Sequence, residues 1–192
     1  MATLMLLQAG AVSAFAATAD GTDYVTADSN SRMPIPKAYV TVDEINNLGG
    51  SMNGNATFFK NPQDIDIDKH DNLYVADTGN NRIILMNAKC ETLAVYTEAD
   101  GIAFNAPEGL FVDEDGDIYV ADTGNKRIVH MSNDGSYIES FFNPEDELVG
   151  TTDFNPSKLV VSPTGLIYVV RGENIMAIDG NNGFRGLFGQ TN

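Results

Sequence analysis

The sequence predicts an all-β protein made of short antiparallel strands, and three observations support this prediction. No stretch of useful length shows helical periodicity. Glycine is frequent, with 18 residues, and stands among many valines, isoleucines, tyrosines and phenylalanines, which is typical of short strands joined by tight turns. One pattern recurs along the chain at a spacing of roughly 45 residues. We therefore expect a fold built from repeated groups of strands.

The recurring pattern is clearest in two segments of equal length. Residues 61–83 read NPQDIDIDKHDNLYVADTGNNRI and residues 106–128 read APEGLFVDEDGDIYVADTGNKRI, so that Pro62 and Pro107 stand 45 residues apart. A weaker third copy, PSKLVVSPTGLIYVVRGENI, starts at Pro156, 49 residues after Pro107. Two near-identical segments in register with their flanks indicate repeated structural units.

Each copy predicts four strands in the same order. The opening proline leads into a short apolar strand, and a turn such as Asp115-Gly116 then leads into a second strand. The Asp-Thr-Gly-Asn turn comes before a third strand, and a fourth strand closes each unit at residues 92–96, 137–142 and 184–188. Four antiparallel strands in about 40–45 residues is the size of one β-propeller blade.

These segments resemble the NHL family of β-propellers. The resemblance rests on the opening proline and on the segments YVADTGNNRI at 74–83 and YVADTGNKRI at 119–128. It covers residues 38–192 and implies an NHL-type propeller with three blades, at residues 57–100, 104–149 and 154–192. The motif is specific for the fold and says little about function, because NHL propellers serve many roles.

The predicted propeller is incomplete. Residues 38–42 (AYVTV), followed by a loop into Pro62, predict an orphan outer strand ahead of the three blades. Three blades do not close a ring, since propellers usually have about 4–8. We therefore expect a partial propeller that is completed by further blades, six in all by analogy with other NHL proteins, or by self-association.

The first residues predict a signal peptide. Residues 3–17 are apolar and rich in small side chains, and Ala14-Phe15-Ala16 fits the pattern before a cleavage site at Ala17, although no basic residue precedes Arg32. Residues 1–16 are therefore predicted as the signal peptide and residues 17–37 as a polar linker. This predicts a secreted or cell-surface protein, in which Asn55 would open a glycosylation sequon. The apolar stretch is too short to predict a membrane span.

The charge balance excludes one class of partner. The chain has 27 acidic and 11 basic residues, for a net charge of -16. Such a surface repels phosphate backbones, so nucleic acid is not an expected partner. It suits solubility, a cation or a basic protein partner. Cys90 is the single cysteine, so the fold has no internal disulfide and must be held together by packing.

The repeated turn predicts a structural device. In the first copy Asp77 can accept hydrogen bonds from turn N–H groups, Gly79 can supply a positive φ, and Arg82 can return to a carboxylate or to carbonyl groups. Asp122, Gly124 and Arg127 repeat the device in the second copy. In the third copy Arg171 replaces the aspartate and the turn is two residues shorter, so we expect that blade to have a looser edge.

Nothing in the sequence demands an enzyme. His70 is predicted in a turn and His130 on a third strand, so the two are not expected to meet at a zinc site. No activated nucleophile is evident. The acidic turn 113–117 departs from the EF-hand pattern, and we expect no cofactor beyond weak calcium binding. The favoured function is an extracytoplasmic binding or protein-interaction module. The alternative is a hydrolase or lyase, resembling the lactonase and peptide-amidating lyase propellers, whose site further blades complete.

If a ligand binds, we expect it at the mouth of the central channel. Residues that follow the opening proline ring this mouth in related propellers, and residues after the motif aspartate stand just beyond. In the amidating lyases zinc-ligand histidines follow the opening proline, and here none does. Because the residues after the opening proline differ between copies, they are where selectivity could reside. The set is Gln63, Thr78, Glu108, Thr123 and Ser157, with Gly172 in the altered third copy.

Overall fold

The structure, a computed structural model, is all-β and describes residues 23–26, 32–35, 58–150 and 153–189. The chain divides into two units, Met1–Glu44 and Ile45–Asn192. The first unit contains an antiparallel hairpin of β1 (Asp23–Thr26) and β2 (Arg32–Ile35), inside the segment predicted to be a linker. The predicted signal peptide, the predicted outer strand at 38–42 and the sequon at Asn55 lie outside the described residues.

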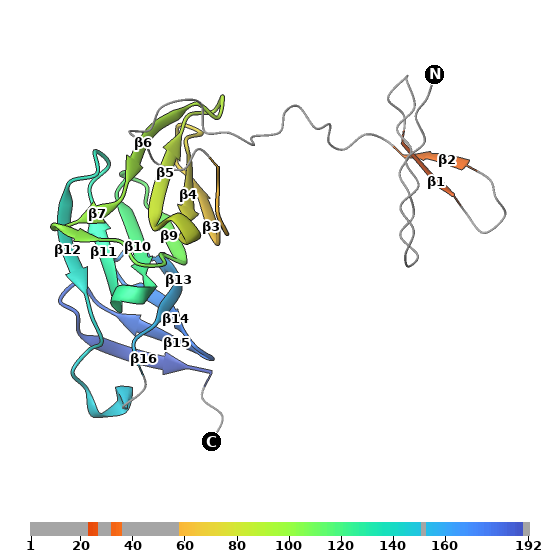
Figure 1. Cartoon of the computed structure of the whole chain (residues 1–192). Coiled ribbons are helices and arrows are strands. Elements are labelled where there is room, and N and C mark those ends of the chain that lie inside the picture. The colour runs from red at the N-terminus through yellow and green to blue at the C-terminus, as the bar shows by residue number, and fades with distance from the viewer. Residues whose placement is uncertain (1–22, 27–31, 36–57, 151–152, 190–192) are drawn as a thin grey trace. The chain divides into compact units, whose positions relative to one another are not determined.

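The described residues of the second unit form three four-stranded antiparallel sheets, which we call blades 1, 2 and 3 (Figure 1). This confirms the predicted partial propeller. In each blade the strands are hydrogen-bonded in chain order, from the inner strand to the outer one. Blade 1 consists of β3 (Asp64–Ile67), β4 (Leu73–Asp77), β5 (Arg82–Met86) and β6 (Thr92–Tyr96).

Blades 2 and 3 repeat this arrangement. Blade 2 consists of β9 (Gly109–Val112), β10 (Ile118–Asp122), β11 (Arg127–Met131) and β12 (Tyr137–Phe141). Blade 3 consists of β13 (Pro156–Val161), β14 (Ile167–Arg171), β15 (Asn174–Ile178) and β16 (Phe184–Phe188). The connection between blades 1 and 2 contains a small hairpin of β7 (Glu98–Ala99) and β8 (Ile102–Ala103).

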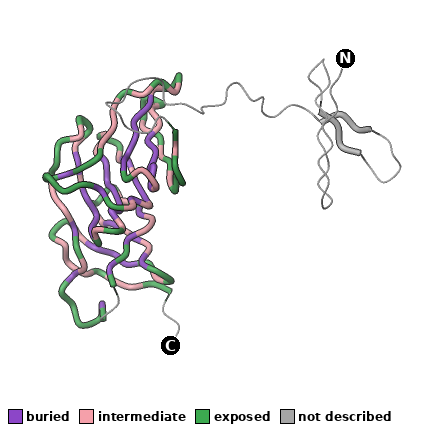
Figure 2. Tube along the Cα trace, viewed as in Figure 1, coloured by how far each residue is buried: buried purple, intermediate pink, exposed green. Residues whose placement is uncertain are grey.

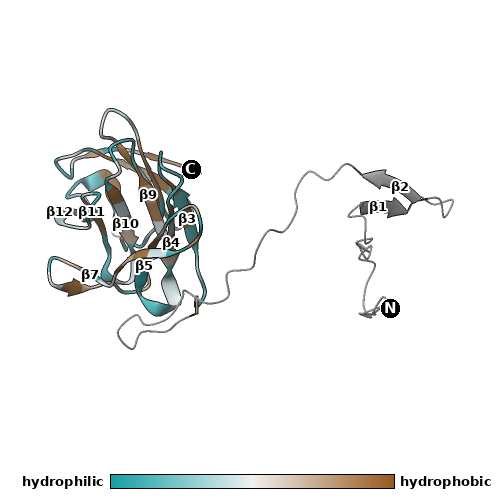
Figure 3. Ribbon diagram, turned by 90° about the horizontal axis from the view of Figure 1, so that it is seen from above, coloured by the Kyte–Doolittle hydropathy of each residue, from teal (hydrophilic) through white to brown (hydrophobic). Residues whose placement is uncertain are grey.

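The core lies between adjacent blades, because each sheet buries both of its faces when it has a neighbour on each side. One cluster joins the face of blade 1 to blade 2, with Tyr74, Leu85, Leu110 and Val120 among its residues. A second cluster joins the other face of blade 2 to blade 3. Buried residues therefore follow the middle strands of the blades, and exposed residues follow the loops (Figure 2). Hydropathy has the same distribution, with apolar residues on strands such as β9 and β10 and hydrophilic residues in several of the turns (Figure 3).

The motif turns differ from the prediction in one respect. Thr78–Asn80 and Thr123–Asn125 form short 3-10 helices, η1 and η2, and the positive φ falls on the residue after each of them, with φ values of 54° at Asn81 and 55° at Lys126. The prediction of a positive φ at Gly79 is therefore wrong.

The glycine of the motif is needed for a close approach instead. A Cβ on Gly79 would lie 2.5 Å from the Lys60 carbonyl oxygen, and one on Gly124 would lie 2.7 Å from the Asn105 carbonyl oxygen. A third short helix, η3 (Glu147–Val149), lies in the connection into blade 3. In the part of the chain that the structure describes, no helix is long and apolar enough to cross a membrane.

Candidate functional site

The repeated aspartate and arginine form a buried ion pair in blades 1 and 2. Arg82 Nε lies 2.7 Å from Asp77 Oδ2, and Arg127 Nε lies 2.8 Å from Asp122 Oδ2, with all four side chains buried. A second guanidinium nitrogen of each arginine donates to a carbonyl of the preceding connection, for example from Arg82 to Phe58. The pair therefore fastens each blade to the chain that enters it, and it has a structural role.

The aspartate accepts its backbone hydrogen bond from a different place than predicted. Asp77 Oδ1 accepts from the Lys60 N–H at 2.7 Å, and Asp122 Oδ1 accepts from the Asn105 N–H at 2.8 Å. Neither carboxylate caps its own turn. The backbone donor therefore lies 17 residues back, in the incoming segment. The turn itself supplies a side-chain N–H, from Asn80 Nδ2 to Asp77 Oδ2 at 2.9 Å and from Asn125 Nδ2 to Asp122 Oδ2 at 2.8 Å.

The two threonines of the predicted ligand site connect neighbouring blades. Thr78 Oγ1 donates to the Pro107 carbonyl oxygen at 2.5 Å, and Thr123 Oγ1 donates to the Pro156 carbonyl oxygen at 2.6 Å. Each hydroxyl thus holds the opening proline of the next blade. In blade 3 the equivalent residue, Gly172, is exposed and has no hydroxyl to offer.

The altered third copy keeps one part of the device. The Arg171 side chain is buried, and it donates to the Val149 carbonyl at 3.1 Å and to Asn143 Oδ1 at 3.4 Å. It has no carboxylate partner among the described residues, and its Nε makes no hydrogen bond there. Burial lowers the pKa of the Arg171 guanidinium. Blade 3 therefore still binds its incoming loop, through a cation that lacks a counter-ion.

The mouth of the predicted channel is organised around a residue that the sequence did not single out. The ammonium of Lys158, on β13, donates to the carbonyl oxygens of Gln63 and Glu108 and lies 3.4 Å from Asp64 Oδ2. One side chain of blade 3 thus contacts blades 1 and 2, at the residues that follow their opening prolines. We call Gln63, Asp64, Glu108, Ser157 and Lys158 the mouth cluster.

A glycine makes this contact possible. Asp64, Gly109 and Lys158 occupy equivalent positions in the three repeats. Gly109 has no side chain, and a Cβ there would collide with the Ser157 carbonyl oxygen. The β9 and β13 backbones can therefore approach each other closely, and the Lys158 side chain passes over blade 2 to reach blade 1.

The predicted mouth residues differ in what they leave free for a ligand. The Glu108 side chain is half-buried, and its carboxylate has no partner among the residues that the structure describes. The Gln63 side chain is exposed. Ser157 Oγ donates to the Val170 carbonyl at 3.3 Å. Of the five predicted residues, the structure gathers Gln63, Glu108 and Ser157 around Lys158, whereas the hydroxyls of Thr78 and Thr123 serve the contacts between blades.

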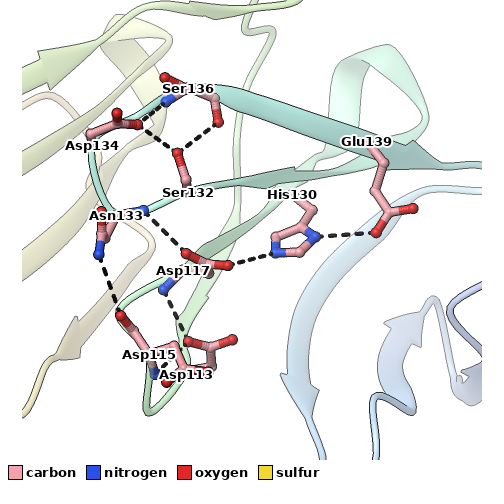
Figure 4. A network of polar contacts seen from close by, with 9 residues as sticks. All are labelled: Asp113, Asp115, Asp117, His130, Ser132, Asn133, Asp134, Ser136 and Glu139. Atoms are coloured by element: carbon pink, nitrogen blue, oxygen red, sulfur yellow. Dashed lines mark hydrogen bonds and ion pairs between the residues drawn. The ribbon is translucent and has the colours of Figure 1, made fainter.

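A second polar network surrounds His130 (Figure 4). Its Nε2 lies 3.4 Å from Asp117 Oδ2, its Nδ1 lies 3.2 Å from Glu139 Oε1, and its ring stacks on Tyr119 at a centroid distance of 4.1 Å. Asp113 Oδ1 accepts the N–H groups of Asp115 and Asp117, so the acidic segment is a hydrogen-bonded hairpin turn. No cluster of three or more metal-ligating side chains occurs within the described ranges.

Comparison with known proteins supports the repeat and the fold. Residues 59–84 and 104–131 match the model of the NHL repeat. A search of curated proteins gives no match. The chain is similar to the solved structure of a streptogramin B lyase, with 14% identity and a TM-score of 0.52 over 91% of this chain and 53% of that one.

Two further structures show the same similarity. A catalytically inactive virginiamycin B lyase from Staphylococcus aureus with quinupristin has 14% identity and a TM-score of 0.52, over 89% of this chain and 53% of that one. The WD40 repeats of RRP9 have 14% identity and a TM-score of 0.52, over 66% of this chain and 38% of that one. The chain thus spans about half the length of the lyases it matches. At this identity the likeness shows a shared propeller fold alone.

Proposed function

We propose that this chain, an NHL-repeat β-propeller, acts as a binding module whose ligand contacts the mouth cluster. One observation carries the proposal. The residues that repeat between blades are used in structural bonds, whereas the residues that differ meet around the Lys158 ammonium. Repeated residues maintain a repeat fold, so the residues that vary are free to determine selectivity.

The chemistry of the mouth cluster favours a polar partner. It offers the Lys158 side chain, which is 44% exposed, the Glu108 carboxylate, which has no partner among the described residues, and the exposed Gln63 side chain. Charges of both signs within one cluster suit a ligand or a protein segment that carries both a donor and an anionic group. The proposed role is therefore recognition of a polar partner. The partner would displace water from these polar groups of the mouth cluster when it binds.

The test uses the full chain, immobilised and exposed to the proteins of its natural surroundings, with retained proteins identified by mass spectrometry. Glu108→Gln is the informative variant, because the fold uses the Glu108 carbonyl and not its carboxylate. We expect this variant to lose the partner while keeping the melting temperature. Ile138→Glu, on the outer strand β12, serves as the control and should retain the partner. Loss on Ile138→Glu with retention on Glu108→Gln would place the binding surface on the rim and refute the proposal.

An enzyme of the hydrolase or lyase class, with a site completed by further blades, is the alternative. Turnover of a lactone or of quinupristin by the chain, abolished by Glu108→Gln, would favour it. Retention of an unmodified partner would favour the binding module.

We also propose that the protein acts outside the cytoplasm, on the basis of the apolar N-terminal segment and its Ala14-Phe15-Ala16 site. N-terminal sequencing of the exported chain should begin at Ala17. Ala16→Arg should block cleavage, because a bulky cation does not fit the small-residue pattern. A chain that stays in the cytoplasm with Met1 intact would refute this part of the proposal.

A further inference from the structure

A cavity of about 440 Å³ lies between blades 2 and 3, at the opposite end of the inner strands from the mouth cluster. Phe111, Tyr119 and Pro163 form apolar parts of its lining, and the acidic turn residues Asp113, Glu114 and Asp115 form another part. None of the described residues that line it is basic. The cavity therefore offers aromatic and carboxylate surfaces without an internal cation.

At the equivalent place between blades 1 and 2, an exposed lysine bridges the two blades. Lys69, in the turn after β3, donates from its ammonium to the Glu114 carbonyl oxygen at 2.9 Å. Beside it, Asp66 Oδ2 accepts the Val112 N–H at 2.8 Å. An alkyl ammonium from one blade thus bridges to the turn of the next blade.

Between blades 2 and 3 the residues at the equivalent positions are different. Glu114 is the equivalent of Lys69, Phe111 is the equivalent of Asp66, and Pro163 is the equivalent of Glu114. A carboxylate cannot donate to the Pro163 carbonyl as the lysine donates to Glu114. The second junction therefore lacks the bridging cation of the first and has an additional acid in its place.

Tyr119 provides an independent observation that favours a ligand in the cavity. The whole residue is 9% exposed, and its hydroxyl makes no hydrogen bond with any residue that the structure describes. The equivalent Tyr74 hydroxyl has Asp68 Oδ2 at 3.5 Å. Burial and the charges of Asp113, Asp117 and Glu139 raise the pKa of Tyr119 to about 12, so at neutral pH the hydroxyl is intact and can accept a hydrogen bond.

We propose that this cavity binds the alkyl ammonium group of a ligand, in the position equivalent to the one that Lys69 occupies between blades 1 and 2. The ammonium is held by Glu114, by the Pro163 carbonyl oxygen and by the Tyr119 hydroxyl. The alkyl stem packs on Phe111, whose ring also offers a π-face to the cation. This site is separate from the mouth cluster, and it goes beyond the binding function proposed there.

The ligand is defined by its chemistry, a primary ammonium on a flexible apolar stem, and two sources supply it. One is a free alkylamine, and the other is a lysine side chain of a protein partner. Calorimetric titrations of the full chain at neutral pH with n-butylamine and with a lysine-containing acetylated peptide separate them. n-Butanol is the neutral control and should not bind, because it lacks the charge that Glu114 requires.

The decisive variant is Glu114→Lys. It introduces the residue type that the first repeat has at the equivalent position, Lys69, and so places an internal ammonium in the cavity. We expect it to weaken amine binding about ten-fold or more, as loss of a charge-assisted hydrogen bond would. The chain should melt at the same or a higher temperature, since the variant adds a contact between blades. Tyr119→Phe keeps the ring, removes the hydroxyl and should weaken binding ~5-fold.

Two controls guard against non-specific attraction to a chain of net charge -16. Glu145→Lys makes the same charge change at an exposed loop residue and should leave amine binding unchanged. Glu108→Gln alters the mouth cluster and should also leave it unchanged, which separates this inference from the proposed function. Equal weakening by Glu114→Lys and Glu145→Lys, or equal affinity for n-butylamine and n-butanol, would overturn the proposal.

Discussion

The Nε atom of Arg82 and the Oδ2 atom of Asp77 lie 2.7 Å apart, with both side chains almost wholly removed from solvent. Replacing either partner alone leaves the other as a buried charge without a counter-ion. We expect Asp77→Ala to lower the free energy of unfolding by about 3–5 kcal/mol, the usual cost of breaking such a pair. Chemical denaturation measures this.

The matched control is Asp71→Asn, at an exposed turn residue, which should change the free energy of unfolding by less than about 0.5 kcal/mol. Asp122→Ala should resemble Asp77→Ala, because it breaks the equivalent pair. If Asp77→Ala left stability unchanged and abolished partner binding, the residue would belong to a binding site and not to the scaffold.

Arg171 differs from Arg82, because its buried guanidinium has no carboxylate partner that a substitution would leave unpaired. Arg171→Met should therefore cost no more than about 1–2 kcal/mol, from the lost hydrogen bonds to Val149 and Asn143. Arg82→Met should lower the free energy of unfolding by more, since it leaves the buried Asp77 carboxylate without a counter-ion. Equal costs for Arg171→Met and Arg82→Met would mean that the counter-ion contributes nothing.

Alkaline titration should detect the buried tyrosines. Burial, followed by the charge of nearby carboxylates, raises the pKa of Tyr74 and Tyr119 from 10.0 to about 12. Because the folded-state pKa exceeds the unfolded value, the stabilisation is complete below pH 10 and is lost as the pH rises towards 12. Burial also raises the pKa of Tyr96. Ultraviolet absorbance should show late-ionising tyrosines in the wild type and one fewer of them in Tyr119→Phe. A single transition near pH 10 for all tyrosines would contradict the burial of these two rings.

The exposed face of blade 1 predicts self-association. Ile65, Ile67 and Leu93 are exposed by 64%, 58% and 55% and lie beside the apolar cluster of Val75 and Ile84. Exposed apolar surface of this kind marks an interaction site or a tendency to aggregate. Light scattering of the isolated chain should give a mass that increases with concentration, and Ile67→Glu should reduce it. Ile138→Glu, on the edge strand β12, is the control and should have a smaller effect. A compact monomer at all concentrations would show that three blades suffice.

The strands could be predicted from the sequence because their signals are local. The opening proline, the hairpin turn and the alternation of apolar residues recur in each copy, and the strands ending in Asp77 and Asp122 occur where that pattern places them. The pairing of each aspartate with the arginine five residues on could be predicted for the same reason.

The contacts between blades could not be predicted in this way. Asp77 binds the Lys60 N–H, and Gly79 is needed for approach to the same residue, because the incoming segment folds back over the turn. Lys158 bonds to a carbonyl 95 residues away, at Gln63. Such partners are set by how the sheets are arranged about a common axis, and no spacing in the sequence encodes this arrangement.

The reach of Lys158 has a consequence for how the molecule unfolds. A repeat protein whose units touch only their neighbours melts as a one-dimensional array, so that a terminal unit can detach while the others persist. Here an ammonium on the third blade holds carbonyls of the first and the second. Detaching blade 3 would break hydrogen bonds to both other blades at once, so it loses more than a contact with one neighbour. The three blades should therefore exchange their amide hydrogens as one cooperative unit, and Lys158→Met should divide that unit into separately melting parts.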